Sequence, residues 1–172
     1  LVALSEGWYR REMLPLQLCD LAAVLAVWAL LTLDRRAVEP LYFFALSATL
    51  PALFATELDV AFPHFRYLVY FVEHGLTVIA AVVLVFGLGL RPSAGAWGRA
   101  FLQVNGLASA AAFLNLALGT NFLYLREKPA GATPFDWFGP WPLYLVVLEL
   151  LVLSLFRLLD LALGRPRGPA QK

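Results

Sequence analysis

The chain has 172 residues, of which 61% are hydrophobic and 15% are charged, whereas soluble domains are typically about half apolar and about 25% charged. This composition predicts an integral membrane protein, and the net charge of +1 gives no indication of nucleic-acid binding. A single cysteine excludes both an intrachain disulfide and a cysteine-rich metal site.

Five stretches are apolar enough, and long enough at about 20 residues, to cross a bilayer as helices. They cover residues 14–33, 41–58, 65–90, 100–120 and 141–163. Pro51 lies inside the second stretch and predicts a kink there. The sequence therefore predicts an all-α polytopic transmembrane bundle of five spanning helices. We expect one domain over residues 1–163 and a disordered cytoplasmic tail over residues 164–172.

The start of the chain suggests that further helices precede it. The first residue is Leu1, and Met13 is the only methionine. Residues 1–4 are apolar and resemble the end of an earlier spanning helix. We therefore expect that one or more N-terminal helices are missing from this sequence.

Basic residues divide unequally between the two sets of loops. One set contains Arg10, Arg11, Arg66, Arg126 and Lys128, and the other contains Arg35, Arg36, Arg91, Arg99, Arg165, Arg167 and Lys172. Because Lys and Arg are more frequent in cytoplasmic loops, the richer second set is expected in the cytoplasm together with the C-terminus. The predicted location is the plasma membrane, crossed several times.

Polar side chains interrupt four of the apolar stretches at similar depths. With a helical rise of about 1.5 Å per residue, Cys19 lies roughly 8 Å from the outer end of its helix, and Asn115 lies roughly 8–10 Å. His74 and Glu149 lie roughly 13–14 Å deep by the same rise. Since polar groups in spanning helices usually face a bundle interior or a cavity, we expect Cys19, His74 and Asn115 to line one cavity open to the outer leaflet.

Cys19 and His74 are a candidate nucleophile and base. The thiolate is the reactive form of cysteine, and a nearby base promotes its formation. Asp20 or Glu149 would orient His74, and Asn115 would donate a hydrogen bond to an oxyanion. Two structural alternatives remain open: Cys19 packs as a small residue on an alanine-rich stripe, and Asn115 bridges two helices.

Other polar residues near the outer helix ends are candidates for binding a lipid headgroup. Arginine forms bidentate contacts with phosphate, although the same side chains also serve as ordinary interfacial anchors. Tyr70 shares one helix face with His74. His64 and His74 have poor spacing for a metal site, so no metal is predicted. The candidate substrate-binding residues are Arg66, Tyr70, Asn121, Tyr124, Arg126 and Lys128.

Five short segments resemble a known family in the same order along the chain. The YwaF-like integral membrane family of bacteria, which has a mammalian transmembrane relative, is similar from about residue 7 to residue 163. Its members usually have additional N-terminal helices. The matching segments are PLQLC (15–19), FPHFR (62–66), EHG (73–75), GTNFLYLREKP (119–129) and GPWP (139–142).

The resemblance implies lipid acyl transfer. The mammalian relative is described as a cysteine-centred acyltransferase that moves a fatty acyl chain from a phospholipid to a lysophospholipid. Its reactive cysteine matches Cys19 and its histidine matches His74, whereas many family members have histidine where this chain has Gln17. No cofactor is expected, and the partner is membrane lipid. A lipid hydrolase, a non-enzymatic carrier of lipid or small molecules, and an accessory subunit are the alternatives.

Overall fold

The computed structural model describes residues 17–56, 58, 60–129 and 133–164. These residues form helices and turns without a strand, which confirms the all-α prediction for the described part of the chain. Five helical rods are present: α2 (Leu18–Thr32); α3 (Arg35–Phe44) with η2 (Ala45–Thr49) and α4 (Leu50–Ala52); α5 (Phe65–Val82) with η3 (Val83–Gly87); α6 (Ala96–Leu118); and α7 (Leu143–Ala162). The short 3₁₀ helices η4 (Phe122–Tyr124) and η5 (Pro134–Phe138) join α6 to α7.

Two of the rods are long and apolar enough to cross a membrane. They are Phe65–Gly87 and Ala96–Leu118, close to the predicted stretches 65–90 and 100–120. Helix α2 has 15 residues and is shorter than a full span. Helix α7 has 20 residues but carries Glu149, Arg157 and Asp160. The structure therefore supports two membrane-spanning helices among the described residues, rather than the five predicted.

The second predicted stretch, 41–58, has different bounds in the structure. Its helix begins at Arg35 because the Asp34 carboxylate accepts a hydrogen bond of 2.8 Å from the Arg36 backbone N–H, which caps the helix start. Pro51, where the sequence predicts a kink, lies in the short helix α4 and has no N–H to donate to the preceding turn. The helix becomes π-helical over η2, which ends two residues before Pro51, and the helix itself ends at Ala52.

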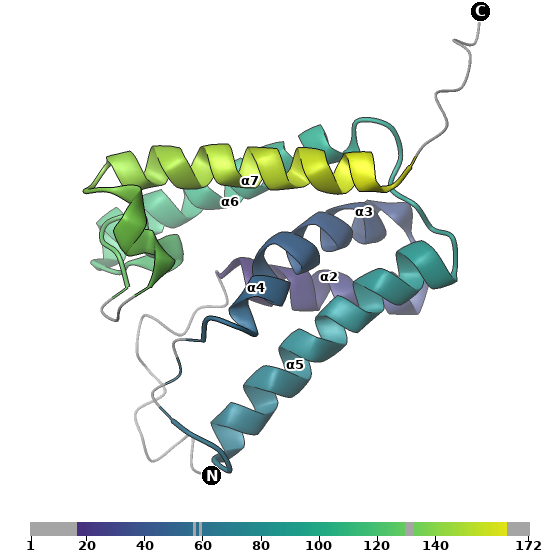
Figure 1. The fold of residues 1–172 in the computed structure, drawn as a ribbon, viewed down its shortest axis with the longest axis horizontal. Helices are drawn as coiled ribbons and strands as arrows, with labels where there is room; N and C mark the ends of the chain where they lie inside the picture. Colours follow the sequence, from purple (N-terminus) through teal and green to yellow (C-terminus); the bar gives the residue numbers. More distant parts are fainter. Residues whose placement is uncertain (1–16, 57, 59, 130–132, 165–172) are drawn as a thin grey trace, which may run out of the picture.

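Helix α3 lies at the centre of the bundle, and its residues from Ala37 onward are buried except for the half-buried Glu39. The rings of Phe43 and Phe44 lie 5.3 and 6.1 Å from the ring of Phe156 in α7. The Tyr42 hydroxyl donates a hydrogen bond of 3.2 Å to the Leu159 carbonyl. These contacts connect α3 to α7, which lies beside α6 in an antiparallel pair above α2, α3 and α5 (Figure 1).

The alanine-rich face of α2 packs in the interior, as the sequence predicts. Ala22, Ala26 and Ala29 are buried and recur at helical spacing. Small side chains let two helix backbones approach closely, and α2 has its most extensive contact with α3. This packing fixes the position of the first turn of α2, which carries Cys19.

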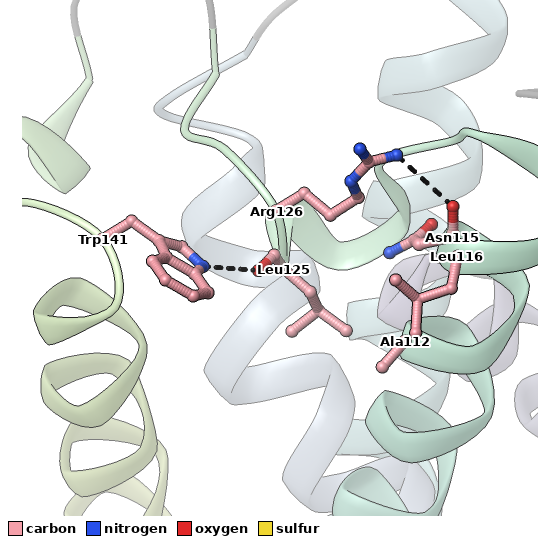
Figure 2. A pocket seen from close by; sticks show the side chains of 6 residues that line it. All are labelled: Ala112, Asn115, Leu116, Leu125, Arg126 and Trp141. Atoms are coloured by element: carbon pink, nitrogen blue, oxygen red, sulfur yellow. Dashed lines mark hydrogen bonds between the residues drawn. The ribbon is translucent and has the colours of Figure 1, made fainter.

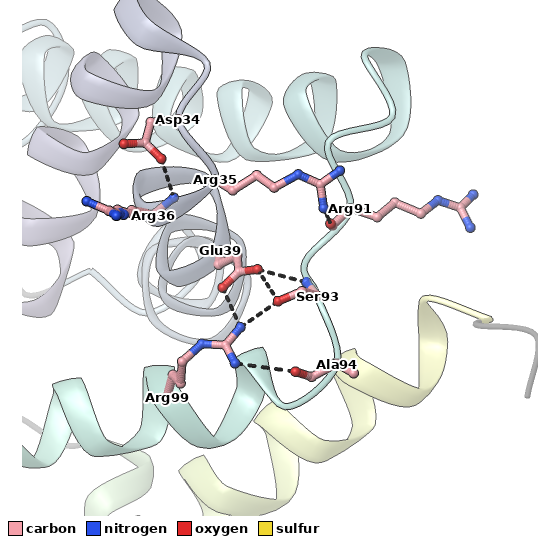
Figure 3. A network of polar contacts seen from close by, with 8 residues as sticks. All are labelled: Asp34, Arg35, Arg36, Glu39, Arg91, Ser93, Ala94 and Arg99. Atoms are coloured by element: carbon pink, nitrogen blue, oxygen red, sulfur yellow. Dashed lines mark hydrogen bonds and ion pairs between the residues drawn. The ribbon is translucent and has the colours of Figure 1, made fainter. Parts of the chain in front are cut away.

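Polar contacts link two loops and the end of α7 at one end of the bundle (Figure 3). The Arg35 Nη1 atom donates to the Arg91 carbonyl at 3.4 Å, and the Arg91 Nη1 atom donates to the Leu163 carbonyl at 3.2 Å. The Glu39 carboxylate accepts from the Ser93 backbone N–H at 2.9 Å and from the Arg99 guanidinium at 2.6 Å. The loops before α3 and α6 and the end of α7 thus lie at the same end of the molecule.

The Glu39–Arg99 pair predicts an acid-sensitive contribution to stability. Burial raises the pKa of Glu39, but hydrogen bonds from Arg99 and Ser93 outweigh burial, so the pKa lies below its usual value. The pair therefore stabilises the fold above the ordinary carboxyl pKa of about 4.3, and this contribution is lost as the pH falls through the lower folded-state pKa.

We expect Glu39→Gln to lower the melting temperature in detergent at pH 7, by the equivalent of about 0.5–1 kcal/mol, since Arg99 is half exposed. The difference from wild type should shrink as the pH falls below that folded-state pKa. Glu127→Gln is the control, because this exposed carboxylate forms no ion pair among the described residues. An equal effect of the two substitutions at pH 7 would contradict the assignment.

Candidate functional site

Cys19 lies in the first turn of α2, where that helix packs against η2 and α5. Its thiol is half-buried and close enough to interact with Thr49 and with the carboxylates of Asp20 and Glu73. The Thr49 Oγ1 atom is buried and has no well-formed hydrogen bond within the described residues. Its hydroxyl is therefore available to the thiol, a contact that the sequence did not lead us to expect.

His74 is held in one orientation on α5. Its side chain is 7% exposed, and its ring stacks on Tyr70 with the centroids 3.9 Å apart. The Tyr70 hydroxyl donates to the Ala52 carbonyl at 2.9 Å, which fixes this ring in turn. The predicted common face of Tyr70 and His74 is therefore confirmed.

The hydrogen bond of His74 determines its tautomer. The Nδ1 atom lies 3.0 Å from the Tyr70 backbone carbonyl. A carbonyl oxygen only accepts hydrogen bonds, so Nδ1 carries the proton in this arrangement. The Nε2 atom of the neutral ring is then an acceptor, which is the state that a general base requires.

Asp20 is the acid that lies near His74. Its charge is close enough to interact favourably with a protonated His74 ring, and its Oδ2 atom accepts a hydrogen bond of 3.0 Å from the Gln17 N–H. Cys19 and His74 form no direct hydrogen bond with each other in the described structure. Such contacts are often long in enzymes without substrate and tighten when substrate binds.

Glu149, the second predicted orienting acid, has another partner. Its Oε1 atom accepts a hydrogen bond of 2.8 Å from the Asn105 side chain on α6. The Asn105 side chain also donates to the Phe101 carbonyl at 3.0 Å. Glu149 thus connects α7 to α6, and Asp20 is the predicted acid that accompanies His74.

Asn115 is fully buried and holds the turn that follows α6. Its Oδ1 atom accepts from the Thr120 hydroxyl at 2.9 Å and from the Phe122 N–H at 2.7 Å. Its Nδ2 atom donates to the Phe122 carbonyl at 3.0 Å. These three hydrogen bonds give Asn115 a structural role in the turn that follows α6.

The remaining candidates fall into two groups. Arg66 lies in the first turn of α5, the helix that carries Tyr70 and His74. The others belong to the connection between α6 and α7. The Asn121 Oδ1 atom accepts a hydrogen bond of 3.0 Å from the Arg126 backbone N–H, and the Tyr124 carbonyl accepts one from the Tyr144 hydroxyl. The Lys128 ammonium lies 4.0 Å from the Asp136 carboxylate and 5.8 Å from the Tyr144 ring centroid.

A cavity of about 440 Å³ opens beside this connection (Figure 2). The Trp141 Nε1 atom donates to the Leu125 carbonyl at 3.2 Å, and the Arg126 Nη1 atom lies 3.4 Å from the Asn115 carbonyl. Asn115 thus borders this cavity, but Cys19 and His74 do not. The lining residues are Ala112, Asn115, Leu116, Leu125, Arg126 and Trp141.

Comparison with known proteins identifies the family. No curated protein and no solved structure gives a significant match. The TMEM164 family matches residues 1–160, which include Cys19, His74 and nearly all of the five helical rods. This chain belongs to the TMEM164 family of membrane proteins.

Proposed function

We propose that this chain is a membrane-embedded lipid acyltransferase with Cys19 as nucleophile and His74 as general base. The observation that supports this proposal is the convergence of Cys19, Asp20, Thr49 and His74 where α2, η2 and α5 pack together. The His74 tautomer, with Nδ1 bound to a carbonyl, leaves Nε2 ready to accept a proton. A thiol, a base and an acid that stabilises the protonated base are the groups required for acyl transfer.

The reaction has two balanced steps. In the first, the Cys19 proton passes to His74 Nε2, and the sulfur attacks the ester carbonyl of a phospholipid. The ester C–O bond breaks, the leaving alkoxide takes the proton from His74, and a thioester on Cys19 and a lysophospholipid result. In the second, His74 removes the proton of a lysophospholipid hydroxyl, whose oxygen attacks the thioester carbonyl. The C–S bond then breaks, a new phospholipid ester leaves, and the Cys19 thiolate takes the proton back from His74.

Neighbouring residues support these steps. Asp20 stabilises the imidazolium that forms when His74 takes a proton, and Thr49 donates a hydrogen bond to the developing thiolate. Arg66 and Tyr70 lie on the His74 helix and are the candidates for headgroup contact at this site. Water in place of the acceptor hydroxyl in the second step gives hydrolysis.

A transfer assay with purified protein tests the proposal. The protein is placed in nanodiscs with a phosphatidylcholine that carries a deuterated acyl chain and with lysophosphatidylethanolamine, and lipid products are followed by mass spectrometry. We expect deuterated phosphatidylethanolamine from wild type, retained rates in Thr49→Ser and reduced rates in Thr49→Val, which lacks the hydroxyl at nearly equal volume. Equal rates in all three proteins would remove Thr49 from the mechanism, and no transfer by wild type would contradict the proposed reaction.

A lipid-binding or carrier protein is the second candidate. The cavity beside Arg126 and Trp141 favours it, because neither Cys19 nor His74 borders that cavity. A carrier predicts lipid binding that is unchanged in Cys19→Ala and no covalent adduct in wild type. The transfer assay separates the two functions, because an acyltransferase forms deuterated phosphatidylethanolamine and a carrier does not.

We further propose that the chain crosses the plasma membrane several times with its C-terminus in the cytoplasm. The support is the clustering of Arg35, Arg91 and Arg99 at the bundle end where α7 terminates. Single cysteines at positions 94 and 127, introduced into a Cys19→Ser background, show which side of the membrane each end of the bundle faces. An impermeant thiol reagent applied to intact cells should label position 127 but not position 94. The reverse pattern would show an inverted topology.

A further inference from the structure

A second cavity of about 420 Å³ lies between α2, α3 and α6. Its volume is within the range of about 300–1,000 Å³ typical of ligand pockets. Side chains from all three helices give it an apolar wall, to which Trp28 contributes an aromatic ring. The wall includes Leu21, Leu25, Trp28, Phe44, Ala96 and Ala100.

The charged residues that line this cavity are two arginines and one glutamate. They are Arg36, Glu39 and Arg99. The Glu39 carboxylate is paired with Arg99 at 2.6 Å, whereas Arg36 bonds within the described structure only through its backbone N–H. Figure 3 shows the Arg36 side chain directed away from the Glu39–Arg99 pair. The lining therefore has one excess positive charge, on an exposed guanidinium that has no carboxylate partner among the described residues.

This cavity is separate from the Cys19 site. Leu21 follows Cys19 by two positions, which places the two side chains about 200° apart around α2. Cys19 faces η2 and α5, whereas Leu21, Leu25 and Trp28 face the cavity next to α6. Helix α2 thus forms a wall between the two, and a ligand in the second cavity does not depend on thiol chemistry.

We propose that this cavity binds one anionic phospholipid, with an acyl chain against the apolar wall and its phosphate on Arg36. The helices that form it belong to a membrane protein, and basic pockets between membrane helices bind anionic lipid headgroups. A guanidinium matches a phosphate in charge and geometry. A zwitterionic lipid adds an ammonium group that the excess positive charge disfavours, so the site prefers a lipid with net negative charge.

Trp28 provides the measurement, because bromine atoms on a bound acyl chain quench its fluorescence. The full chain in phosphatidylcholine nanodiscs receives increasing fractions of phosphatidylglycerol or phosphatidylcholine with brominated chains. Subtracting the signal of the matching Trp28→Phe protein isolates Trp28 from the other four tryptophans. We expect wild-type Trp28 to be quenched at lower fractions of phosphatidylglycerol than of phosphatidylcholine.

Arg36→Gln and Arg35→Gln form a matched pair of variants. Both remove one positive charge from the same end of the bundle, but the Arg35 guanidinium contacts the Arg91 carbonyl instead of lining the cavity. We expect Arg36→Gln to reduce the preference for phosphatidylglycerol about fivefold, the usual contribution of one basic residue near a lipid surface, and Arg35→Gln to retain it. Equal losses in both variants would indicate general surface attraction and overturn the proposal, as would an absence of preference in wild type. Competition by glycerol phosphate alone would contradict the acyl-chain contact.

Discussion

Cys19→Ala is expected to reduce acyl transfer by at least about a thousandfold, since the loss of a covalent nucleophile removes the reaction pathway rather than one contact. The fold should survive, because the substitution deletes one sulfur from a helix face already built of alanines, and the cavity that it leaves is small. Transfer between labelled phospholipid and lysophospholipid in nanodiscs gives the rate. The melting temperature in detergent gives the stability.

Two further substitutions test the separate roles of the Cys19 thiol and the His74 base. Cys19→Ser should also lose most activity, because a serine hydroxyl is much harder to deprotonate than a thiol. His74→Asn should lose comparable activity, while its side-chain amide can still donate to the Tyr70 carbonyl as Nδ1 does. The double variant of Cys19 and His74 should lose little more than either single variant, since groups that act as a unit are not additive. Wild-type turnover by purified Cys19→Ala would contradict the cysteine mechanism.

Asn115→Ala is expected to destabilise the protein by about 2–4 kcal/mol, because it leaves buried polar groups without hydrogen-bond partners. It removes the acceptor for the Thr120 hydroxyl and for the Phe122 N–H, and the donor to the Phe122 carbonyl. A buried polar group left without a partner costs about 1–3 kcal/mol. Thr120→Val is the graded control, because it removes one of these three hydrogen bonds and should cost about 1 kcal/mol. Thermal unfolding of the purified variants in detergent gives the comparison.

The same variant distinguishes the two roles considered for Asn115. A structural role predicts lower stability, with activity that follows the amount of folded protein. An oxyanion donor predicts the opposite pattern, with wild-type stability and a large fall in transfer rate. Wild-type stability with a large fall in transfer rate would support the catalytic role of Asn115.

Much of the fold follows from local sequence features. The apolar stretches that became α5 and α6 contain no proline and have abrupt polar or glycine-rich ends, so their bounds lie within four residues of those predicted. The alanines of α2 were recognisable as a packing face because they recur at helical spacing. The sequence places the start of α3 too late because Arg35, Arg36 and Glu39 resemble a loop, whereas the Asp34 cap places them in a helix.

Less of the site than of the fold can be predicted from the sequence, because the depth of a residue along a helix does not fix the direction in which its side chain points. Asn115 and Glu149 have depths similar to those of Cys19 and His74, but they bond to their own turn and to α6. The sequence does not single out Thr49, because a single hydroxyl in an apolar helix usually bonds to its own backbone. Its proximity to Cys19 depends on how η2 packs against α2, which is a tertiary contact.

Detection of the acyl group on Cys19 tests the proposed mechanism most directly. Purified protein is incubated with phospholipid but without lysophospholipid, quenched in acid and analysed by intact and peptide mass spectrometry. The mechanism predicts an increase equal to one acyl chain in wild type, located on the peptide that contains Cys19, sensitive to hydroxylamine and absent from Cys19→Ala. Transfer to added lysophospholipid without such an adduct, or an adduct on any other residue, would contradict it.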